Sequence, residues 1–367
     1  MLLGRNRAPD RADVLRRIES AGVKSAKAGQ VGYVQDGSSL QQVFYREMWR
    51  TAAEEIGAKF SPVEGTIWEV SCQGKRTRLN LHQTELDNPV ALSVAGDKAL
   101  CHRLLAAGEL PVPDYLQFSP DEVCAAHRFV ERHRGYFVIK PSGGTSAARG
   151  ITTFVATLKE CTRAAALASA YNRQILIERM APGELYRLLV LRGKVIHAIR
   201  RPGVRIRGDG ASTIVQLTAR TLSELASSPK QTTTLDLSKD RDFLANLHAQ
   251  NLDMSSVADK GTEWIVKSYG SRMDRKVEEN PSYTEDATGQ IGDELKGVAE
   301  RAAGLIRSEF AAVELITPST AKPVQMDGGR IIEINTTPGL GPHFDLAIAA
   351  GAANPATAVL RCLLGLN

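Results

Sequence analysis

Apolar residues recur at spacings of three and four in several segments of the chain. The clearest segment is 39–56, whose apolar positions fall on one helical face and which Gly57 ends. This spacing predicts amphipathic helices, and Asp97 and Ser119 are suitable N-caps before two of them. Helices are predicted over residues 10–22, 39–56, 98–107, 119–133, 157–171, 240–250, 290–307 and 355–364, with one more beginning at Ser212.

Short runs of apolar and β-branched residues, bounded by glycine or proline, alternate with these helices. Such runs are typical of strands, and tight turns such as 73–75 and 192–194 predict that neighbouring runs pair antiparallel. Strands are predicted over residues 66–71, 76–81, 136–141, 151–155, 174–180, 184–191, 195–201, 263–269, 311–317 and 330–336.

The last predicted strand pair carries a group of oxygen ligands. Glu333 and Asn335 are two residues apart, so they point from one face of their strand, and Glu314 on the partner strand can meet them there. Carboxylate and amide oxygens suit a hard divalent cation, above all Mg²⁺. An alternative is that these three residues form the solvated polar face of an exposed hairpin. The apolar neighbours favour burial, and buried carboxylates need a partner.

A lysine at the end of the strand 136–141 is followed directly by a loop rich in glycine and hydroxyl residues. Such a loop can present backbone N–H groups to phosphates, although its spacing differs from that of a Walker loop. The alternative is an ordinary turn. The residues of this candidate phosphate site are Lys140, Ser142, Gly143, Gly144, Thr145 and Ser146.

Two further charged features end strands. Glu178 precedes the turn Ala181-Pro182-Gly183, and a basic run follows the strand 195–201. The run either clamps an anion or forms a solvated face, and the pattern alone leaves both open. Its members are Arg200, Arg201, Arg205 and Arg207.

Composition narrows the classes of function. A chain of 367 residues with 43% hydrophobic and 24% charged residues predicts a globular protein of two or three subdomains. The net charge of +5 and 5% aromatic residues argue against a nucleic-acid partner. The five scattered cysteines suit a reducing compartment. Arg5 and Arg7 are followed by no apolar run, so we expect a cytoplasmic protein with no membrane partner.

Taken in order, these motifs resemble the ATP-grasp superfamily of carboxylate–amine ligases, and most closely the ATP-grasp part of cyanophycin synthetase and of bifunctional glutathione synthetase. The resemblance covers roughly residues 90–345. It is carried by Gly96-Asp97-Lys98-Ala99-Leu100, Ile177-Glu178-Arg179 with Pro182-Gly183, Tyr186-Arg187-Leu188-Leu189-Val190, Gly208-Asp209-Gly210-Ala211-Ser212-Thr213-Ile214 and Ile332-Glu333-Ile334-Asn335 with Pro338-Gly339-Leu340.

The resemblance implies an α+β fold in which two α+β subdomains grip ATP, preceded by a smaller α/β N-terminal domain. The expected division is 1–90 for the N-terminal substrate domain, 91–173 for the subdomain with the two lysines and the Gly-rich lid, and 174–367 for the subdomain with the adenine hinge, the arginines and the metal site.

The resemblance also implies roles for individual residues. Lys98 and Lys140 would neutralise the ATP phosphates, with the loop Ser142–Ser146 closing over them. Glu178 would accept from the adenine amino group, and the backbone of Arg179 and Met180 would hold the ring edge. Relatives place an acidic residue on the ribose where this chain has Leu185, so Glu184 is expected to replace it.

Further implied roles concern the metal and the substrates. Two Mg²⁺ ions, with Mn²⁺ as the alternative, would be held by Glu314, Glu333 and Asn335. The transferred phosphoryl group would be stabilised by Lys140, Arg187 and either Arg200 or Arg201. The residues expected to contact a substrate are Arg272, Arg205 and Gly339.

The implied activity is amide-bond formation between a small carboxylate and an amine, each an amino acid or a small peptide, through an acylphosphate. Phosphorylation turns a poor electrophile into a good one, and uniting two anions calls for cations. The alternatives are a ligase that extends a peptide or protein, a nucleotide-binding regulator without turnover, and a metal-binding or structural protein without ATP. A homodimer or higher homo-oligomer is the expected assembly.

Overall fold

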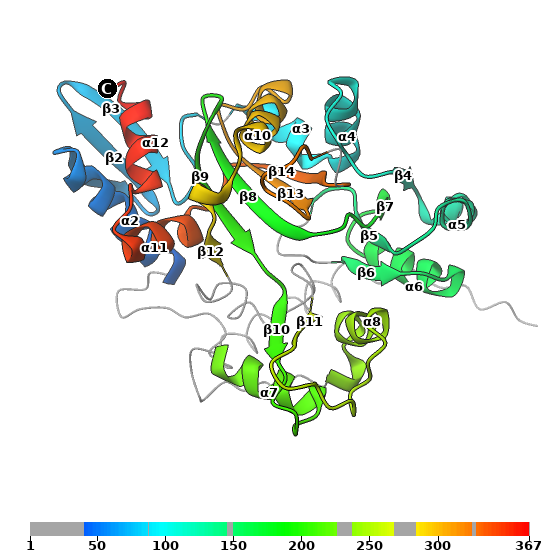
Figure 1. Ribbon diagram of the computed structural model, residues 1–367. Coiled ribbons are helices and arrows are strands. Elements are labelled where there is room, and N and C mark those ends of the chain that lie inside the picture. The colour runs from blue at the N-terminus through cyan, green and yellow to red at the C-terminus, as the bar shows by residue number, and fades with distance from the viewer. Residues whose placement is uncertain are drawn as a thin grey trace, which may run out of the picture.

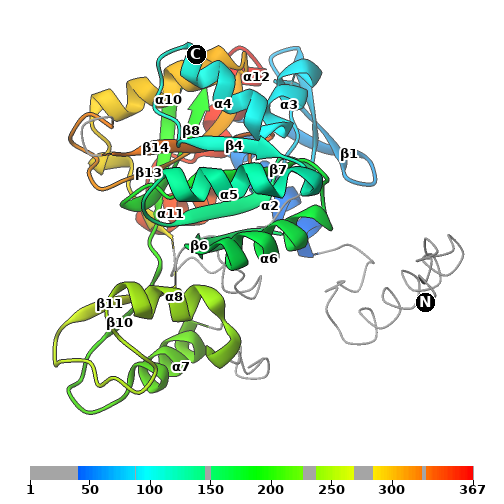
Figure 2. The ribbon, with the colours of Figure 1, turned by 90° about the vertical axis from the view of Figure 1, so that its right-hand side faces the viewer.

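The computed structural model describes residues 40–86, 88–144, 150–225, 237–267, 284–324 and 328–366. Four antiparallel sheets and their covering helices make up this part of the chain (Figures 1 and 2). The predicted helix 10–22 and the predicted site residues Thr145, Ser146 and Arg272 lie outside the described residues.

The N-terminal unit is a three-stranded sheet, in the order β1-β2-β3, covered by one long helix. Trp49 and Trp68 are buried between the helix and the sheet. The same hydrophobic core includes Leu189 and Phe310 of the five-stranded sheet and residues of helix α12. The N-terminal unit therefore has no separate core and shares one with the five-stranded sheet. The elements are α2 (Leu40–Glu55), β1 (Lys59–Glu64), β2 (Ile67–Cys72) and β3 (Lys75–Asn80).

A four-stranded sheet with the order β4-β7-β5-β6 forms one wall of the central region. Two helices pack on its outer face around Phe118, Phe137 and Ile177. Its elements are β4 (Tyr115–Phe118), a short 3₁₀ turn (Pro120–Glu122), α5 (Val123–Arg132), β5 (Phe137–Pro141), β6 (Thr152–Val155), α6 (Leu158–Ser169) and β7 (Ile175–Arg179).

A five-stranded sheet with the order β12-β9-β8-β13-β14 forms the opposite wall. Alternate residues of β8 divide its two faces, because Leu188 joins the core under α10 and α4 whereas Leu189 joins the core of the N-terminal unit. The strands are β8 (Glu184–Leu191), β9 (Lys194–Arg201), β12 (Glu285–Asp286), β13 (Phe310–Thr317) and β14 (Arg330–Thr336). The helices around it are α3 (Pro89–Gly96), α4 (Lys98–Ala107), a 3₁₀ turn (Thr288–Gln290), α10 (Asp293–Leu305), α11 (Gly341–Ala350) and α12 (Pro355–Leu363).

A small lobe is inserted between β9 and β12 and lies below the rest of the molecule in both ribbon views (Figures 1 and 2). It has its own core, which includes Ile206, Phe243 and Val266. The lobe touches the four-stranded sheet where Thr153 Oγ1 donates to Asp242 Oδ1 at 3.0 Å. Its elements are β10 (Val204–Arg207), α7 (Ile214–Leu225), a 3₁₀ turn (Leu237–Lys239), α8 (Arg241–Ala249) and β11 (Glu263–Lys267).

The sheets do not follow the expected division of the chain. Strand β7 pairs with β4 and β5 and so belongs to the four-stranded sheet, which the expected boundary at residue 173 cuts. The helix carrying Lys98 packs against the five-stranded sheet instead, through Cys101 and Leu105. The elements that were not predicted include β1, α3, α11 and β12. Their sequences are short or uniformly apolar, so they show clearly neither the helical period of 3.6 residues nor the strand period of two.

No single helix of the described residues has the length and apolar character to cross a bilayer. The bent pair Gly341–Ala350 and Pro355–Leu363, at 115°, passes the same test when the two helices are taken together.

Candidate active site

One row of residues crosses the whole five-stranded sheet. Glu333 of β14 lies opposite Glu314 of β13, Glu314 lies opposite Arg187 of β8, and Arg187 lies opposite Ile199 of β9. Ile199 in turn lies opposite Asp286 of β12. Directly paired residues point to the same face of a sheet, so all five side chains share the face that also packs on the N-terminal unit.

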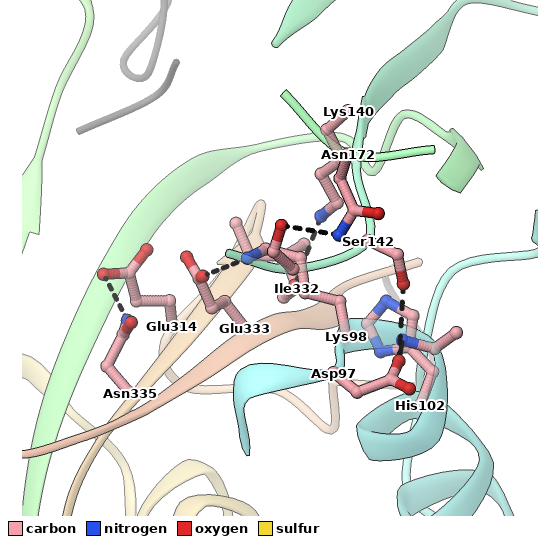
Figure 3. Close-up of polar contacts among 12 residues, drawn as sticks. Asp97, Lys98, His102, Lys140, Ser142, Asn172, Glu314, Ile332, Glu333 and Asn335 are labelled. Carbon is pink, nitrogen blue, oxygen red and sulfur yellow. Dashed lines mark hydrogen bonds and ion pairs between the residues drawn. The ribbon is translucent and has the colours of Figure 1, made fainter. Parts of the chain in front are cut away.

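The centre of this row is a buried ion pair. Arg187 Nη1 donates to Glu314 Oε1, and both side chains are 10% exposed. Asn335 Nδ2 donates to the same Glu314 oxygen at 3.3 Å (Figure 3). The predicted convergence of Glu314, Glu333 and Asn335 on one sheet face is therefore present, and an arginine from a strand over 100 residues away joins it.

Lys98 reaches the edge of this row from helix α4. Asp97 caps that helix by accepting from the N–H groups of Ala99 and Leu100, as predicted, which fixes Lys98 at the first helical position. Lys98 Nζ lies 2.9 Å from Glu333 Oε1 (Figure 3). Burial disfavours the charged form of each group. The attraction between the two charges outweighs this effect, so the pKa of Lys98 is raised and the pKa of Glu333 is lowered.

The opposite wall carries a second charged cluster around Glu178 of β7. His102 Nε2 donates to Glu178 Oε1 at 2.8 Å, and Lys140 Nζ lies 2.8 Å from the same oxygen. Burial by itself would raise the pKa of Glu178, but Lys140 and the hydrogen bond from His102 hold that pKa at about 2. Glu178 is thus an anion that already has two partners before any ligand is present.

Lys140 also joins the two walls, because its ammonium group lies 3.5 Å from the carbonyl oxygen of Ile332 in β14. Between the walls lies a cleft of about 980 Å³. The predicted site residues that line it are Lys98, Lys140, Glu178, Arg179, Met180, Glu184, Arg187, Arg201, Glu314, Glu333 and Asn335. Most of the predicted cations and all the predicted metal ligands are thus brought to one cavity.

The structure separates the two candidate arginines of β9. Arg201 lies opposite Leu185, on the face of Arg187, and lines the cleft. Arg200 lies opposite Tyr186, on the other face, and does not line it. Arg201, and not Arg200, therefore lies on the face that borders the cleft, because neighbouring strand residues point to opposite faces.

Glu184 is occupied by arginines. Arg200 Nη1 donates to Glu184 Oε2 at 2.9 Å, and Arg205 Nη2 donates to Glu184 Oε1. Arg200 also pairs with Glu285 of β12. Both oxygens of Glu184 are thus engaged by arginines, although Glu184 lines the cleft, whereas Arg205 and the predicted Gly339 do not line it.

The described start of the Gly-rich loop is packed against helix α4 instead of lining the cleft. The Ser142 carbonyl accepts from the N–H of Lys98 at 2.9 Å, and its hydroxyl donates to Asp97 at 3.3 Å. A Cβ on Gly143 would lie 2.2 Å from the Gly96 carbonyl oxygen, so only glycine fits there. Ser142 and Gly143 therefore anchor the loop, and Gly144 does not line the cleft either.

The donor set on the sheet face fits a hard cation. Among the described residues no group of three histidine, cysteine, aspartate or glutamate side chains gathers to hold a metal ion, so the site depends on the amide of Asn335 beside Glu314 and Glu333. Two carboxylates and one amide oxygen leave coordination positions for phosphate oxygens and water, as Mg²⁺ prefers.

Three buried histidines were missed at the sequence level. His102 supports Glu178, whereas His197 of β9 and His343 of α11 lie against each other with 3.1 Å between their Nδ1 atoms. Single histidines in apolar segments have no local signature, and their partners lie over 70 residues away in the chain.

The chain has the fold of ATP-grasp ligases. The bifunctional glutathione synthetase of Pasteurella multocida superposes on 87% of this chain and 43% of its own, with a TM-score of 0.53 and 16% sequence identity. No protein-family model matches the chain.

Two kinds of curated protein are similar in sequence. Cyanophycin synthetase of Geminocystis herdmanii is 29% identical over 259 residues, which are 69% of this chain and 28% of the relative. That of Crocosphaera subtropica is 30% identical over 266 residues, 69% and 29% of the two chains. The bifunctional glutathione biosynthesis protein of Listeria monocytogenes is 26% identical over 276 residues, 71% and 33%. The chain is a distant relative of the ATP-grasp portions of these proteins and spans about a third or less of their length.

Proposed function

We propose that this protein is an ATP-dependent ligase that joins a carboxylate to an amine, releasing ADP and phosphate. The observation that carries the proposal is the row Glu333–Glu314–Arg187, which faces a cleft with Lys98 and Lys140 on its walls. The relationship to ATP-grasp ligases supports the same reading. Amino acids or small peptides are the substrates we expect, since the relatives' names are those of enzymes that make glutathione and cyanophycin.

The charge arrangement suits a polyphosphate. Lys98 and Lys140 approach the cleft from opposite walls, so a triphosphate lying between them would be neutralised from both sides. The hinge from Arg179 to Gly183 lies at the same cleft and offers backbone groups to a base. Glu178 positions Lys140 in this proposal, because the lysine is held on a carboxylate that stays ionised.

Glu314, Glu333 and Asn335 would hold Mg²⁺, and the bound ion would supply positive charge that offsets the charge developing on the phosphate. Arg187 lies beside these residues, and we expect it to bind the substrate carboxylate and then the acylphosphate. Attack by the carboxylate oxygen on the γ-phosphorus breaks the bond to the β-phosphate oxygen and releases ADP. The amine nitrogen then attacks the acyl carbon, and the C–O bond to phosphate breaks.

The test is ADP release with ATP and Mg²⁺ against pooled amino acids and dipeptides, followed by mass spectrometry of the products. The expected result is ADP that depends on particular pairs, with a product at the summed mass minus water. Glu333→Gln removes a metal ligand with little change of volume, and Glu47→Gln on the surface of α2 is the matched control. ATP binding without turnover against small molecules, peptides and proteins alike would contradict the proposal.

A further inference from the structure

The charged side chains that meet between the two walls of the cleft form one-to-one pairs. The pairs are Lys98 with Glu333 at 2.9 Å, Lys140 with Glu178 at 2.8 Å, and Arg187 with Glu314. All six residues line the cleft. The three pairs are electrically neutral, so a divalent cation bound alone would leave an excess of positive charge, and a polyphosphate bound alone would leave an excess of negative charge.

The candidate metal ligands are engaged by groups of the protein itself. Arg187 donates to Glu314, and Asn335 presents its Nδ2 donor to the same carboxylate at 3.3 Å. Beside them the ammonium group of Lys98 lies on Glu333 (Figure 3). An ammonium group repels a metal ion that approaches the carboxylate it is paired with. A metal ion therefore gains most from Glu333 once Lys98 has moved away.

Lys98 can exchange its partner more easily than Lys140. Lys140 lies on the buried Glu178, which also accepts from His102. Its ammonium group lies in addition 3.5 Å from the carbonyl oxygen of Ile332. The partner of Lys98, in contrast, is partly exposed to the cleft.

The backbone of Lys98 is fixed, whereas its side chain has several rotatable bonds. Its N–H donates to the Ser142 carbonyl at 2.9 Å, and the cap formed by Asp97 holds the start of the helix. A lysine side chain carries its charge on a flexible four-carbon stem. The ammonium group can therefore move from Glu333 to an anion in the cleft without any shift of helix α4.

We propose that Lys98 occupies the metal ligand Glu333 until a phosphate group takes its ammonium group, so that the metal ion and the polyphosphate promote each other's binding. The inference rests on the proposed nucleotide and metal site and deepens it. A phosphate oxygen that takes Lys98 leaves Glu333 for the metal, and a metal on Glu333 leaves Lys98 for the phosphate. This coupling is reciprocal, as any coupling between two binding equilibria must be.

The experiment measures the metal with and without the nucleotide, because the two also associate in solution. Mn²⁺ alone is titrated onto the full-length protein and followed by the electron paramagnetic resonance of free Mn²⁺. The complex of Mn²⁺ with the β,γ-imido analogue of ATP is titrated by calorimetry. Lys98→Met removes the charge and keeps the length of the side chain. It should bind Mn²⁺ alone about 10-fold more tightly and the complex about 10-fold more weakly. Loss of structure would weaken both.

Two matched variants show whether the gain comes from the pair. In a Glu333→Gln background, Lys98→Met should change the affinity for Mn²⁺ alone by less than about twofold, because the carboxylate that Lys98 occupies is gone. Lys194→Met removes an exposed lysine of β9 that pairs with Glu300 at 3.5 Å and does not line the cleft. It should change neither affinity by more than about twofold.

Two measurements keep the test decisive if Lys98→Met folds poorly. Lys98→Gln is a second variant with the same expected directions. A crystal structure of the unaltered protein with Mn²⁺ and the analogue, with Mn²⁺ located by its anomalous scattering, needs no variant. The expected result has Glu333 on Mn²⁺ and the Lys98 ammonium group on a phosphate oxygen.

The outcomes separate the exchange from the ligase proposal. Tighter binding of Mn²⁺ alone in the Lys98 variants, lost in the Glu333→Gln background, supports the exchange. Unchanged or weaker binding of Mn²⁺ alone in variants that fold, or a structure in which Lys98 stays on Glu333 beside the bound metal, overturns the exchange and leaves the ligase proposal standing. If the unaltered protein binds neither Mn²⁺ nor the complex, both proposals fall together.

Discussion

The two walls of the cleft bury carboxylates in different ways. On the four-stranded sheet Glu178 is 4% exposed and held by His102 and Lys140 together. On the five-stranded sheet the Glu333 side chain is 29% exposed and, among the described residues, forms an ion pair with Lys98. The first carboxylate is enclosed by permanent partners, whereas the second can exchange its lysine for a ligand. The number of enclosing partners thus distinguishes Glu178 from Glu333.

The largest expected effect concerns activity. Glu333→Gln should lower ADP release at least about 100-fold, because it removes a charged ligand where phosphate charge must be offset. Its free energy of unfolding should fall by less than that of Glu178→Gln, since the Glu333 side chain is 29% exposed and Lys98 keeps the attraction of Glu178 and Glu314. Steady-state ADP release measures the activity, and urea unfolding measures the stability. A loss of stability in Glu333→Gln as large as that in Glu178→Gln would contradict the difference between the two carboxylates.

The opposite result is expected on the other wall. Glu178→Gln removes the carboxylate that lies 2.8 Å from the buried Lys140 ammonium group, so the free energy of unfolding should fall by about 3 kcal/mol. Urea unfolding measures this change. Glu131→Gln, an exposed change on α5, is the control, and an unfolding midpoint for Glu178→Gln equal to that of the control would contradict the assigned support role.

A third prediction follows from the depressed pKa of Glu178. A carboxyl group that ionises more readily in the folded protein stabilises it above the unfolded pKa, and that stability is lost as the pH falls. For Glu178 the loss should occur between about pH 4.5 and the folded pKa of about 2. We expect the unfolding free energies of the native protein and Glu178→Gln to become more similar as the pH falls through this window. A difference that stays constant with pH would show that folding does not lower the pKa of Glu178.

The smallest expected effect concerns the metal alone. Saturating Mg²⁺ should raise the melting temperature of the native protein by a few degrees, since a ligand at 100 times its dissociation constant stabilises by about 2.7 kcal/mol. Glu314→Gln should reduce this shift, and Glu178→Gln should keep it. Differential scanning fluorimetry with and without Mg²⁺ tests the point, and equal shifts in native protein and Glu314→Gln would place the metal elsewhere.

Much of the secondary structure could be predicted from local pattern. The strands 184–191 and 330–336 were predicted at their observed bounds, and helix 98–107 was predicted with its cap. The hairpin of Glu314, Glu333 and Asn335 was also predicted, because a period of two and a connector rich in turn residues place these residues on one face. Strand β1 and helix α11 lacked such a signal.

The sequence by itself therefore determined which segments form strands and helices and which oxygen ligands share a hairpin, because these depend on residues close in the chain. Only the tertiary structure decided which residues far apart in the chain contact one another. The pairing of β8 with β13 sets Arg187 against Glu314, and the register of β9 places Arg201, and not Arg200, on the face that borders the cleft. The contacts of His102 with Glu178 and of His343 with His197 were also decided by the tertiary structure. Long-range contacts depend on how whole elements pack and not on local spacing.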